Sequence, residues 1–180
     1  MLFSILEAHA RRHAALPTIV FRLRIAGADE VEAIVLRTQI RIDPHTKNSP
    51  AFAWADIPVM VPAFSGETEV DVNVPCTYDF DVTATRYFAA RDEEAIPLRF
   101  FFSGSIFRRE EQSFSVAMLS WQSECSYRMP LSVWRDAMRE CYGDSVLVRI
   151  SRETFELLQR IRTERHATNW DDVITRCVTT

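Results

Sequence analysis

The sequence predicts an α+β fold, in which an antiparallel β-sandwich or partly open barrel of about seven to eight strands precedes a C-terminal helical cap. Three observations lead to this prediction. Short segments that alternate between apolar and polar residues recur over the first two thirds of the chain. Turn residues separate them at roughly ten-residue intervals. Beyond Trp121, apolar residues recur instead at steps of three and four, as on one side of a helix.

The composition is that of one globular domain. The chain has 180 residues, of which 47% are hydrophobic and 26% charged, as in ordinary folded proteins. We expect a single domain over residues 1–180, with a β-rich part at 1–121 and an α-rich cap at 122–180. A net charge of −4 disfavours a general nucleic-acid binder. Four glycines leave no phosphate-binding loop.

No targeting segment is expected. The N-terminal apolar run is short and has no basic region before it, unlike a signal peptide. No segment has eighteen uninterrupted apolar residues, the length at which a membrane span is considered. The expected location is therefore the cytoplasm.

The first two strands are predicted at "TIVFRLRI" and "EAIVLRTQIRID". In each, apolar residues fill every second position, which is typical of a half-buried antiparallel strand. Arg22 and Arg24 lie on the polar side of the first segment, and Arg37 and Arg41 on that of the second. The intervening "AGADE" predicts that the two strands form a hairpin.

The segment 43–62 is interrupted by prolines and predicts a long connection with a short strand at 57–61. Trp54 lies in this connection, where it either folds onto the core or anchors a partner. Four more strands are predicted at "TEVDVNV", "TYDFDVTATRYF", "IPLRFFFSGSIF" and "SFSVAMLSW". The third of these is apolar on both sides around Phe100–Phe102, as in a central strand covered on both faces.

The helical cap begins after Pro130, which a first helical turn tolerates. Its first helix ends at Gly143 and shows a stripe of apolar residues: Leu131, Trp134, Met138 and Cys141. "SVLVRI" at 145–150 predicts one more short strand. Ser151 is placed to cap a second helix, and a third begins near Thr168 or Asn169 with two aspartates in its first turn.

Two acidic rows are candidates for a metal site or for glycoside chemistry: Glu67, Glu69 and Asp71, and Asp79 and Asp81. We favour the simpler interpretation that they line the solvent face of the sheet and pair across strands with the arginines. Arginines left unpaired would instead mark an anion or partner site. The candidates for an interaction surface are Arg22, Arg24, Arg37, Arg41 and Trp54.

The cysteines and histidines predict neither a metal nor a cofactor. Cys76, Cys125, Cys141 and Cys177 have long, irregular gaps, without the close spacing of zinc ligands. Reduced thiols are expected. His9 and His13 are spaced by four, but their surroundings favour a strand end and a loop over the helix that a metal pair needs. No set of catalytic residues is predicted.

A pocket between the sheet and the cap is the alternative candidate site. Its residues would be Tyr78, Asp79, Tyr127 and Arg128. Arg128 follows the β-rich part at the start of the cap, where it could clamp a carboxylate or a phosphate. The simpler interpretation is that Arg128 stabilises this junction through an ion pair or a carbonyl.

Several segments together resemble a known bacterial family. They are "PTIVFRLRI", "LRTQIRIDP", "VPCTYDFDV", "FFSGSIF" and above all "ECSYRMPLSVWRDAM". The family is the domain of unknown function numbered 6084, and the likeness runs from Leu16 to Trp170. The segment 43–61 is shorter than the corresponding loop of that family. The family has no established activity, and its members are often encoded near uptake nickel–iron hydrogenase genes, which implies an accessory or assembly role.

These observations favour a non-enzymatic accessory or protein-interaction protein, with hydrogenase subunits or maturation factors as possible partners. One alternative is a small-molecule binder or hydrolase that uses the pocket candidates. Another is a chaperone-like β scaffold that self-assembles through its sheets into a homo-oligomer.

Overall fold

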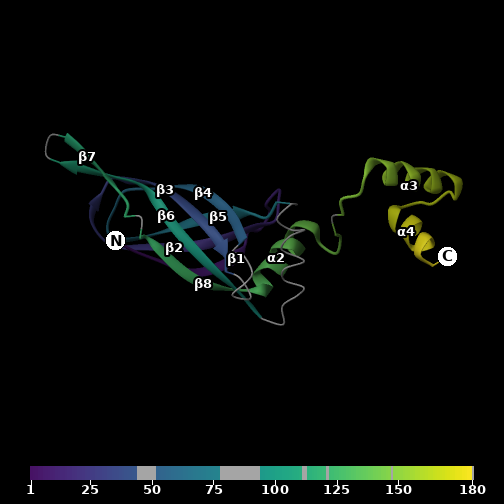
Figure 1. Ribbon diagram of the computed structural model, residues 1–180, viewed down its shortest axis with the longest axis horizontal. Helices are drawn as coiled ribbons and strands as arrows, with labels where there is room; N and C mark the ends of the chain where they lie inside the picture. Colours follow the sequence, from purple (N-terminus) through teal and green to yellow (C-terminus); the bar gives the residue numbers. More distant parts are fainter. Residues whose placement is uncertain (44–51, 78–93, 111–112, 121, 147, 180) are drawn as a thin grey trace. The chain divides into compact units, whose positions relative to one another are not determined.

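The computed structural model describes residues 1–43, 52–77, 94–110, 113–120, 122–146 and 148–179 (Figure 1). It divides into two compact units, Met1–Asp144 and Ser145–Thr180. In the described residues, the first unit holds two antiparallel sheets and one helix, and the second holds two helices. The predicted α+β class is confirmed. The single domain over 1–180 stays a prediction, and the first cap helix belongs to the unit that contains the sheets.

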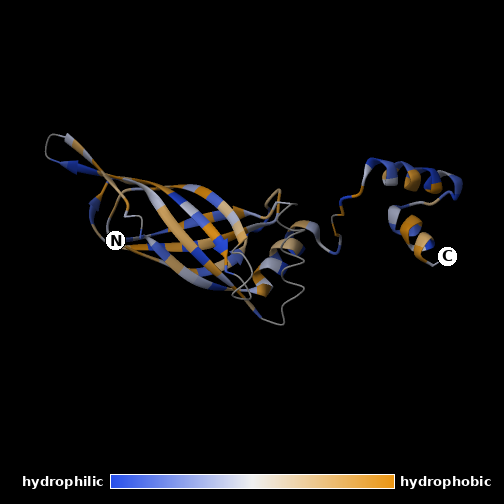
Figure 2. Cartoon of the chain, in the orientation of Figure 1, coloured by the Kyte–Doolittle hydropathy of each residue, from blue (hydrophilic) through white to orange (hydrophobic). Residues whose placement is uncertain are grey.

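The two sheets have different sizes. Sheet A has the order β1 (Leu2–Ala10), β2 (Thr18–Val31), β5 (Phe64–Pro75). Sheet B has the order β4 (Phe52–Val61), β3 (Ala33–Ile42), β6 (Ala95–Glu110), β7 (Ser113–Met118). Its fifth strand, β8 (Glu124–Pro130), pairs with the first half of β6. Figure 2 shows how apolar and polar residues alternate along these strands.

The predicted hairpin of the first two strands is wrong. β2 pairs with β1 and β5, whereas β3 pairs with β4 and β6, so the chain changes sheet at Glu32. Shifts in the β2–β5 register after Ala26 and after Ala28 mark bulges where β2 bends, as strands do at a sandwich corner. An alternating pattern shows which side of a strand is apolar. It does not show whether two such strands lie side by side or face each other.

Three other segments differ in the structure from the predicted strands and connections. β4 covers ten residues and includes Trp54, because its pairing with β3 runs almost its whole length despite the proline. β8 occupies the segment predicted to join sheet and cap. Residues 145, 146 and 148–150 form no strand, since they pair with no described neighbour. The strand predicted at "TYDFDVTATRYF" falls on residues 78–88, outside the described residues. The central position of β6 is confirmed, but the prediction that both its faces are covered is wrong, because Arg99 and Ser103 on its outer face are exposed.

The core of the first unit lies between the sheets. Phe21 of β2 meets three aromatic rings of sheet B: Phe100 at 5.1 Å, Trp54 at 5.8 Å and Tyr127 at 6.3 Å between centroids, all edge to face. The inward rows of β2 and β3 are fully buried. Their residues are Ile19, Phe21, Leu23 and Ile25, and Ile34, Leu36, Ile40 and Ile42.

The helix ends follow the predicted signals. α2 (Leu131–Tyr142) begins after Pro130, and the Gly143 N–H donates to the carbonyl of Arg139 at 2.8 Å. Ser151 caps α3 (Arg152–Glu164) by accepting from the Thr154 N–H at 3.1 Å. Asn169 caps α4 (Trp170–Val178) by accepting from the Asp172 N–H at 2.8 Å. Among the described residues, none of these helices has the length and apolar character to cross a membrane.

Candidate interaction surface

The first pair of candidate arginines is neutralised within sheet A. Arg22 Nε donates to Asp71 Oδ1 at 2.7 Å, and its Nη1 lies 3.6 Å from Glu69. Arg24 donates to Glu67 through two nitrogens. These hydrogen bonds raise the pKa of both guanidinium groups, Asp71 acting on Arg22 and Glu67 on Arg24. The predicted cross-strand pairing of these arginines with the acidic row of β5 is confirmed.

The second pair lies on the other sheet and is also engaged. Arg37 Nε donates to Asp56 Oδ1 at 2.7 Å, and the Arg37 hydrogen bond holds the pKa of Asp56 below its usual value. Arg41 stacks over the Phe101 ring at 4.9 Å. Because β2 and β3 belong to different sheets, the four arginines line two separate outer faces. They do not form one basic stripe, and each interacts with another side chain of the first unit.

Trp54 packs onto the core of the first unit. It lies in β4, half-buried, with its ring edge-on to Phe21. Of the two roles left open for it, the structure shows packing on the core, within a strand of the sheet.

The pocket candidates do not come together in the described residues. Tyr127 and Arg128 are neighbours on β8 and therefore face opposite sides of sheet B. Tyr127 points inward, where burial raises the pKa of its hydroxyl and the backbone of Ala8 hydrogen-bonds to it. Arg128 is exposed on the outer side. Tyr78 and Asp79 lie outside the described residues.

The thiols are free and mostly shielded. Cys76 is buried, and burial raises the pKa of Cys125 to about 11. Cys125 hydrogen-bonds to the backbone of Ile5, as Tyr127 does to Ala8, so β8 is tied to β1 along one side of the sandwich. No group of three histidine, cysteine or acidic residues that could hold a metal ion exists among the described residues.

The hollows at the end of β1 are open and lined by charged side chains. One of about 490 Å³ lies between β1 and α2, and one of about 500 Å³ lies beside β2 and β5. His9 and Arg12 border both. Their carboxylate neighbours include Asp136 and Asp71, so neither hollow has the single sign of charge that selects an anion.

The outer face of sheet B carries a feature that the sequence analysis did not find. Five large apolar side chains are exposed there and form what we call the outer apolar patch: Val35 (44%), Met60 (66%), Phe114 (65%), Val116 (58%) and Met118 (74%). They come from β3, β4 and β7. Clusters of this kind on a protein surface commonly mark a binding site, unlike scattered single residues.

Strand register makes the patch continuous. Met60 is paired with Val35, Val35 with Ser105, and Ser105 with Met118, so one row crosses all four strands. In the next row Val116 is paired with half-buried Phe107. Paired residues on one face of a sheet lie about 5 Å apart, so these side chains contact along each row.

Charged groups border the patch on two sides. Arg109 stacks over Phe114 at 5.5 Å and pairs with Glu32 at 3.1 Å. Farther along the same face lie the Arg37–Asp56 pair and the Arg99–Asp43 pair, the latter at 3.4 Å. The face is thus divided into an apolar part and an ion-paired part, so polar groups adjoin the apolar patch as they do in protein interfaces.

The signal for the patch was present in "SFSVAM". Its large apolar residues alternate with Ser113, Ser115 and Ala117, and the usual interpretation turns the large residues inward. In the structure they face outward, because Ala117 pairs with Ile106, which points into the core. Beyond β6, β7 pairs with no other described strand. In Figure 1 it runs with the end of β6 past the other strands.

A family model matches the whole chain, over residues 1–51 and 46–180, and its description is "Family of unknown function (DUF6084)". The chain belongs to this family. The resemblance seen in the sequence is thereby confirmed. No curated protein sequence matches this DUF6084 member.

Solved structures give only distant likenesses to this DUF6084 member. A protein from Archaeoglobus fulgidus is 16% identical, with 71% of this chain and 99% of that chain covered and a TM-score of 0.29. The sporulation control protein Spo0M from Bacillus subtilis is 8% identical, with 71% and 49% covered and a TM-score of 0.31. β-Glucosidase 3B from Thermotoga neapolitana is 13% identical, with 70% and 16% covered and a TM-score of 0.27. The chain spans about half of Spo0M and a small part of the glucosidase. Scores this low carry no argument about function.

Proposed function

We propose that this protein is a non-enzymatic accessory protein that binds a protein partner through the outer apolar patch. The observation that carries the proposal is the cross-strand row in which Met60, Val35 and Met118 are exposed and apolar, with Ser105 between Val35 and Met118. Covering a side chain that is half to three-quarters exposed contributes roughly 1–2 kcal/mol. Five such residues together contribute about 5–10 kcal/mol, which is comparable in size to the entropic cost of association.

The partner we propose presents an extended segment with apolar residues at alternate positions. β7 offers a strand edge with no described neighbour beyond β6, and such an edge adds a partner strand through backbone hydrogen bonds. Phe114, Val116 and Met118 lie beside this edge on one face, where alternate side chains of an added strand would contact them.

Hydrogenase subunits or maturation factors are the partners that the gene association of the DUF6084 family suggests, and the proposal includes a cytoplasmic location shared with them. The arginine-lined faces have less support as the binding surface, since Arg22, Arg24 and Arg37 pair with acids of their own sheet. The hydrolase alternative has no supporting geometry in the described residues, because Tyr127 and Arg128 face opposite sides.

The test is affinity purification of the tagged chain from its native host, with mass spectrometry. The patch variant is Val116→Lys with Met118→Lys. The matched control is Leu2→Lys, because Leu2 is as exposed as Met118, at 75% against 74%, but lies on sheet A. A second comparison variant changes Arg22, Arg24, Arg37 and Arg41 to Ser.

We expect hydrogenase-related proteins to be recovered with the wild type and the Leu2 control and lost with the patch variant. A photo-crosslinker at position 116 should join the chain to the same protein, and one at position 2 should not. If only the arginine variant lost the partner, the binding surface would be the arginine-lined faces and not the outer apolar patch. Recovery of only the chain itself, crosslinked at position 116, would favour the self-assembling scaffold.

A further inference from the structure

The second unit, Ser145–Thr180, buries very little of its own apolar surface. Only Ala167 and Val173 are buried among its described residues. Its exposed large apolar residues are Val146, Val148, Ile150, Phe155, Leu157, Ile174 and Val178. Trp170 of α4 contacts α3, with its ring 5.3 Å from the Phe155 ring and its centroid 5.0 Å from the Arg162 guanidinium.

A unit this small needs additional support. Chains below about 40 residues rarely fold without a disulfide, a metal or association with another chain. Cys177 is the unit's single cysteine and is free and exposed, so no disulfide can form within the unit. Its described residues hold no group of three metal-ligating side chains. Packing against a surface outside the unit would supply this support, and a second copy of the chain is one such surface.

One side of α3 shows what kind of surface would fit. Glu153, Leu157 and Arg160 follow one another at steps of four and three, so they lie on the same side of the helix. Leu157 is 50% exposed. Neither Glu153 nor Arg160 forms an ion pair with a described residue. This side therefore presents an apolar residue between two exposed, opposite charges that form no ion pair with a described residue.

The arrangement is complementary to itself. When two copies of α3 pack antiparallel, the start of one helix lies beside the end of the other. Glu153 of each copy then faces Arg160 of its partner, and the two Leu157 side chains meet at the two-fold axis, as an isologous interface requires. The unit has six arginines and five acidic residues, so it adds little net repulsion at the proposed contact.

We infer that two copies of this chain associate through antiparallel packing of α3, with Leu157 at the centre and two Glu153–Arg160 pairs beside it. The surface belongs to the second unit and shares no residue with the outer apolar patch, and the inference does not depend on the proposed function. Because one pair of helices buries less than the roughly 800 Å² per partner of a standard interface, the dimer forms in a concentration-dependent way.

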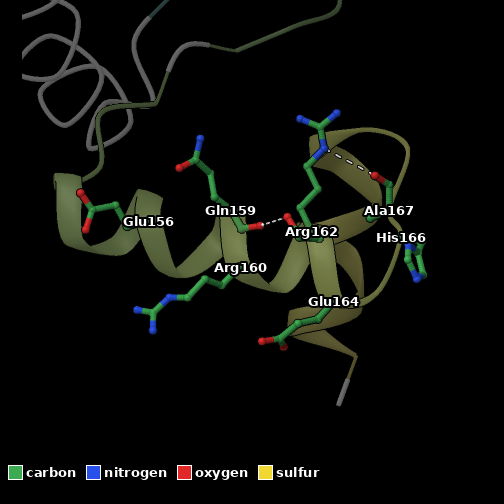
Figure 3. A pocket seen from close by; sticks show the side chains of 8 residues that line it. Glu156, Gln159, Arg160, Arg162, Glu164, His166 and Ala167 are labelled. Carbon is green, nitrogen blue, oxygen red and sulfur yellow. Dashed lines mark hydrogen bonds between the residues drawn. The ribbon is translucent and has the colours of Figure 1, made fainter.

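The first test is sedimentation velocity on the full chain over a range of concentrations. We expect a monomer–dimer equilibrium whose Kd rises about tenfold or more in Glu153→Arg and in Arg160→Glu, because each variant brings like charges together. Leu157→Glu should do the same. Gln159→Lys is the control, because the Gln159 side chain projects away from that of Arg160 (Figure 3), and its change should leave the Kd unaltered.

Mixing the two single variants is the decisive experiment. In a mixed dimer one copy carries E153R and the other carries R160E, so both pairs again join opposite charges and the mixture should dimerise as well as the wild type. The double variant E153R/R160E should dimerise likewise. If Glu153 and Arg160 instead paired only with residues of their own helix, mixing the two variants would not restore dimerisation. Circular dichroism shows whether each variant is folded, and rescue by mixing is independent of small losses in helix stability.

Three results would overturn the inference: a wild type that stays monomeric at all concentrations, a dimer insensitive to Leu157→Glu, or single variants that fail to recover when mixed. Variants of Val116 and Met118 should leave the dimer unchanged. A failure of the patch proposal and a failure of the dimer are thus distinguishable.

Discussion

Phe21 of β2 and Phe100 of β6 meet edge to face, with 5.1 Å between ring centroids and 71° between ring planes. Both side chains are fully buried, and each belongs to a different sheet. Because Phe21 also contacts Trp54 and Tyr127, it joins β2 to three strands of sheet B at once.

Phe21→Ala should therefore lower the free energy of unfolding by about 3–5 kcal/mol, the range for removing a buried aromatic ring. Urea denaturation of the full chain, followed by tryptophan fluorescence, measures this. The control is Leu2→Ala, which removes an exposed side chain of the same unit and should change stability by less than about 0.5 kcal/mol. Similar losses in both variants would contradict the role given to Phe21.

Gly104→Ala should destabilise the first unit through a steric clash between β6 and β3. Gly104 has φ +151°, and a Cβ there would lie 2.1 Å from the carbonyl oxygen of Val35, a backbone atom. The expected loss is about 2–4 kcal/mol in urea denaturation. Gly66→Ala is the comparison, because Gly66 also has a positive φ, +77°, but has open space around it. It tests backbone strain without a steric clash and should lower the free energy of unfolding by only about 1 kcal/mol.

Thr38→Val should stabilise the protein. Thr38 is fully buried in the inward row of β3, and its hydroxyl has no hydrogen-bond partner among the described residues. Valine has nearly the same shape without the polar group, so the gain should be about 1 kcal/mol. Thr38→Ser keeps the hydroxyl and loses the methyl group, so it should destabilise. A loss of stability in Thr38→Val would indicate that the hydroxyl has a partner.

The Arg37–Asp56 pair should make a small contribution to the pH dependence of stability. The pKa of Asp56 is lowered in the folded state, chiefly by the Arg37 hydrogen bond. Its contribution is therefore complete above the ordinary aspartate pKa of 3.8 and is lost as the pH falls through the lowered value. Asp56→Asn should reduce stability slightly at neutral pH and not at strongly acidic pH.

Urea denaturation of Asp56→Asn and the wild type over a series of pH values checks this, and added salt should shrink the difference because the pair is exposed. Asp71→Asn is a matched comparison on sheet A, where Arg22 loses its main partner. A difference between wild type and Asp56→Asn that persists below the lowered pKa would contradict the assignment.

Local features of this chain followed directly from its sequence. The alternation in β2 and β3 identified their buried residues, and Ser151, Asn169 and Gly143 marked helix ends at the correct positions. The opposite signs of the arginines and the acidic row predicted that they pair across strands, as Arg22 does with Asp71. Each of these depends on neighbours within a few residues or on simple complementarity of charge, which a linear sequence contains.

The tertiary structure decided what depends on partners distant in sequence. The alternating pattern is the same whether two strands are neighbours in one sheet or lie in two facing sheets. Only the tertiary structure showed that β2 and β3 belong to different sheets. Strand pairing placed Trp54 in β4 and turned Tyr127 and Arg128 to opposite faces. It also turned Phe114, Val116 and Met118 outward, since Ala117 took the inward register beside Ile106. The outer apolar patch exists because those long-range pairings, rather than the local pattern, set which side of β7 meets water.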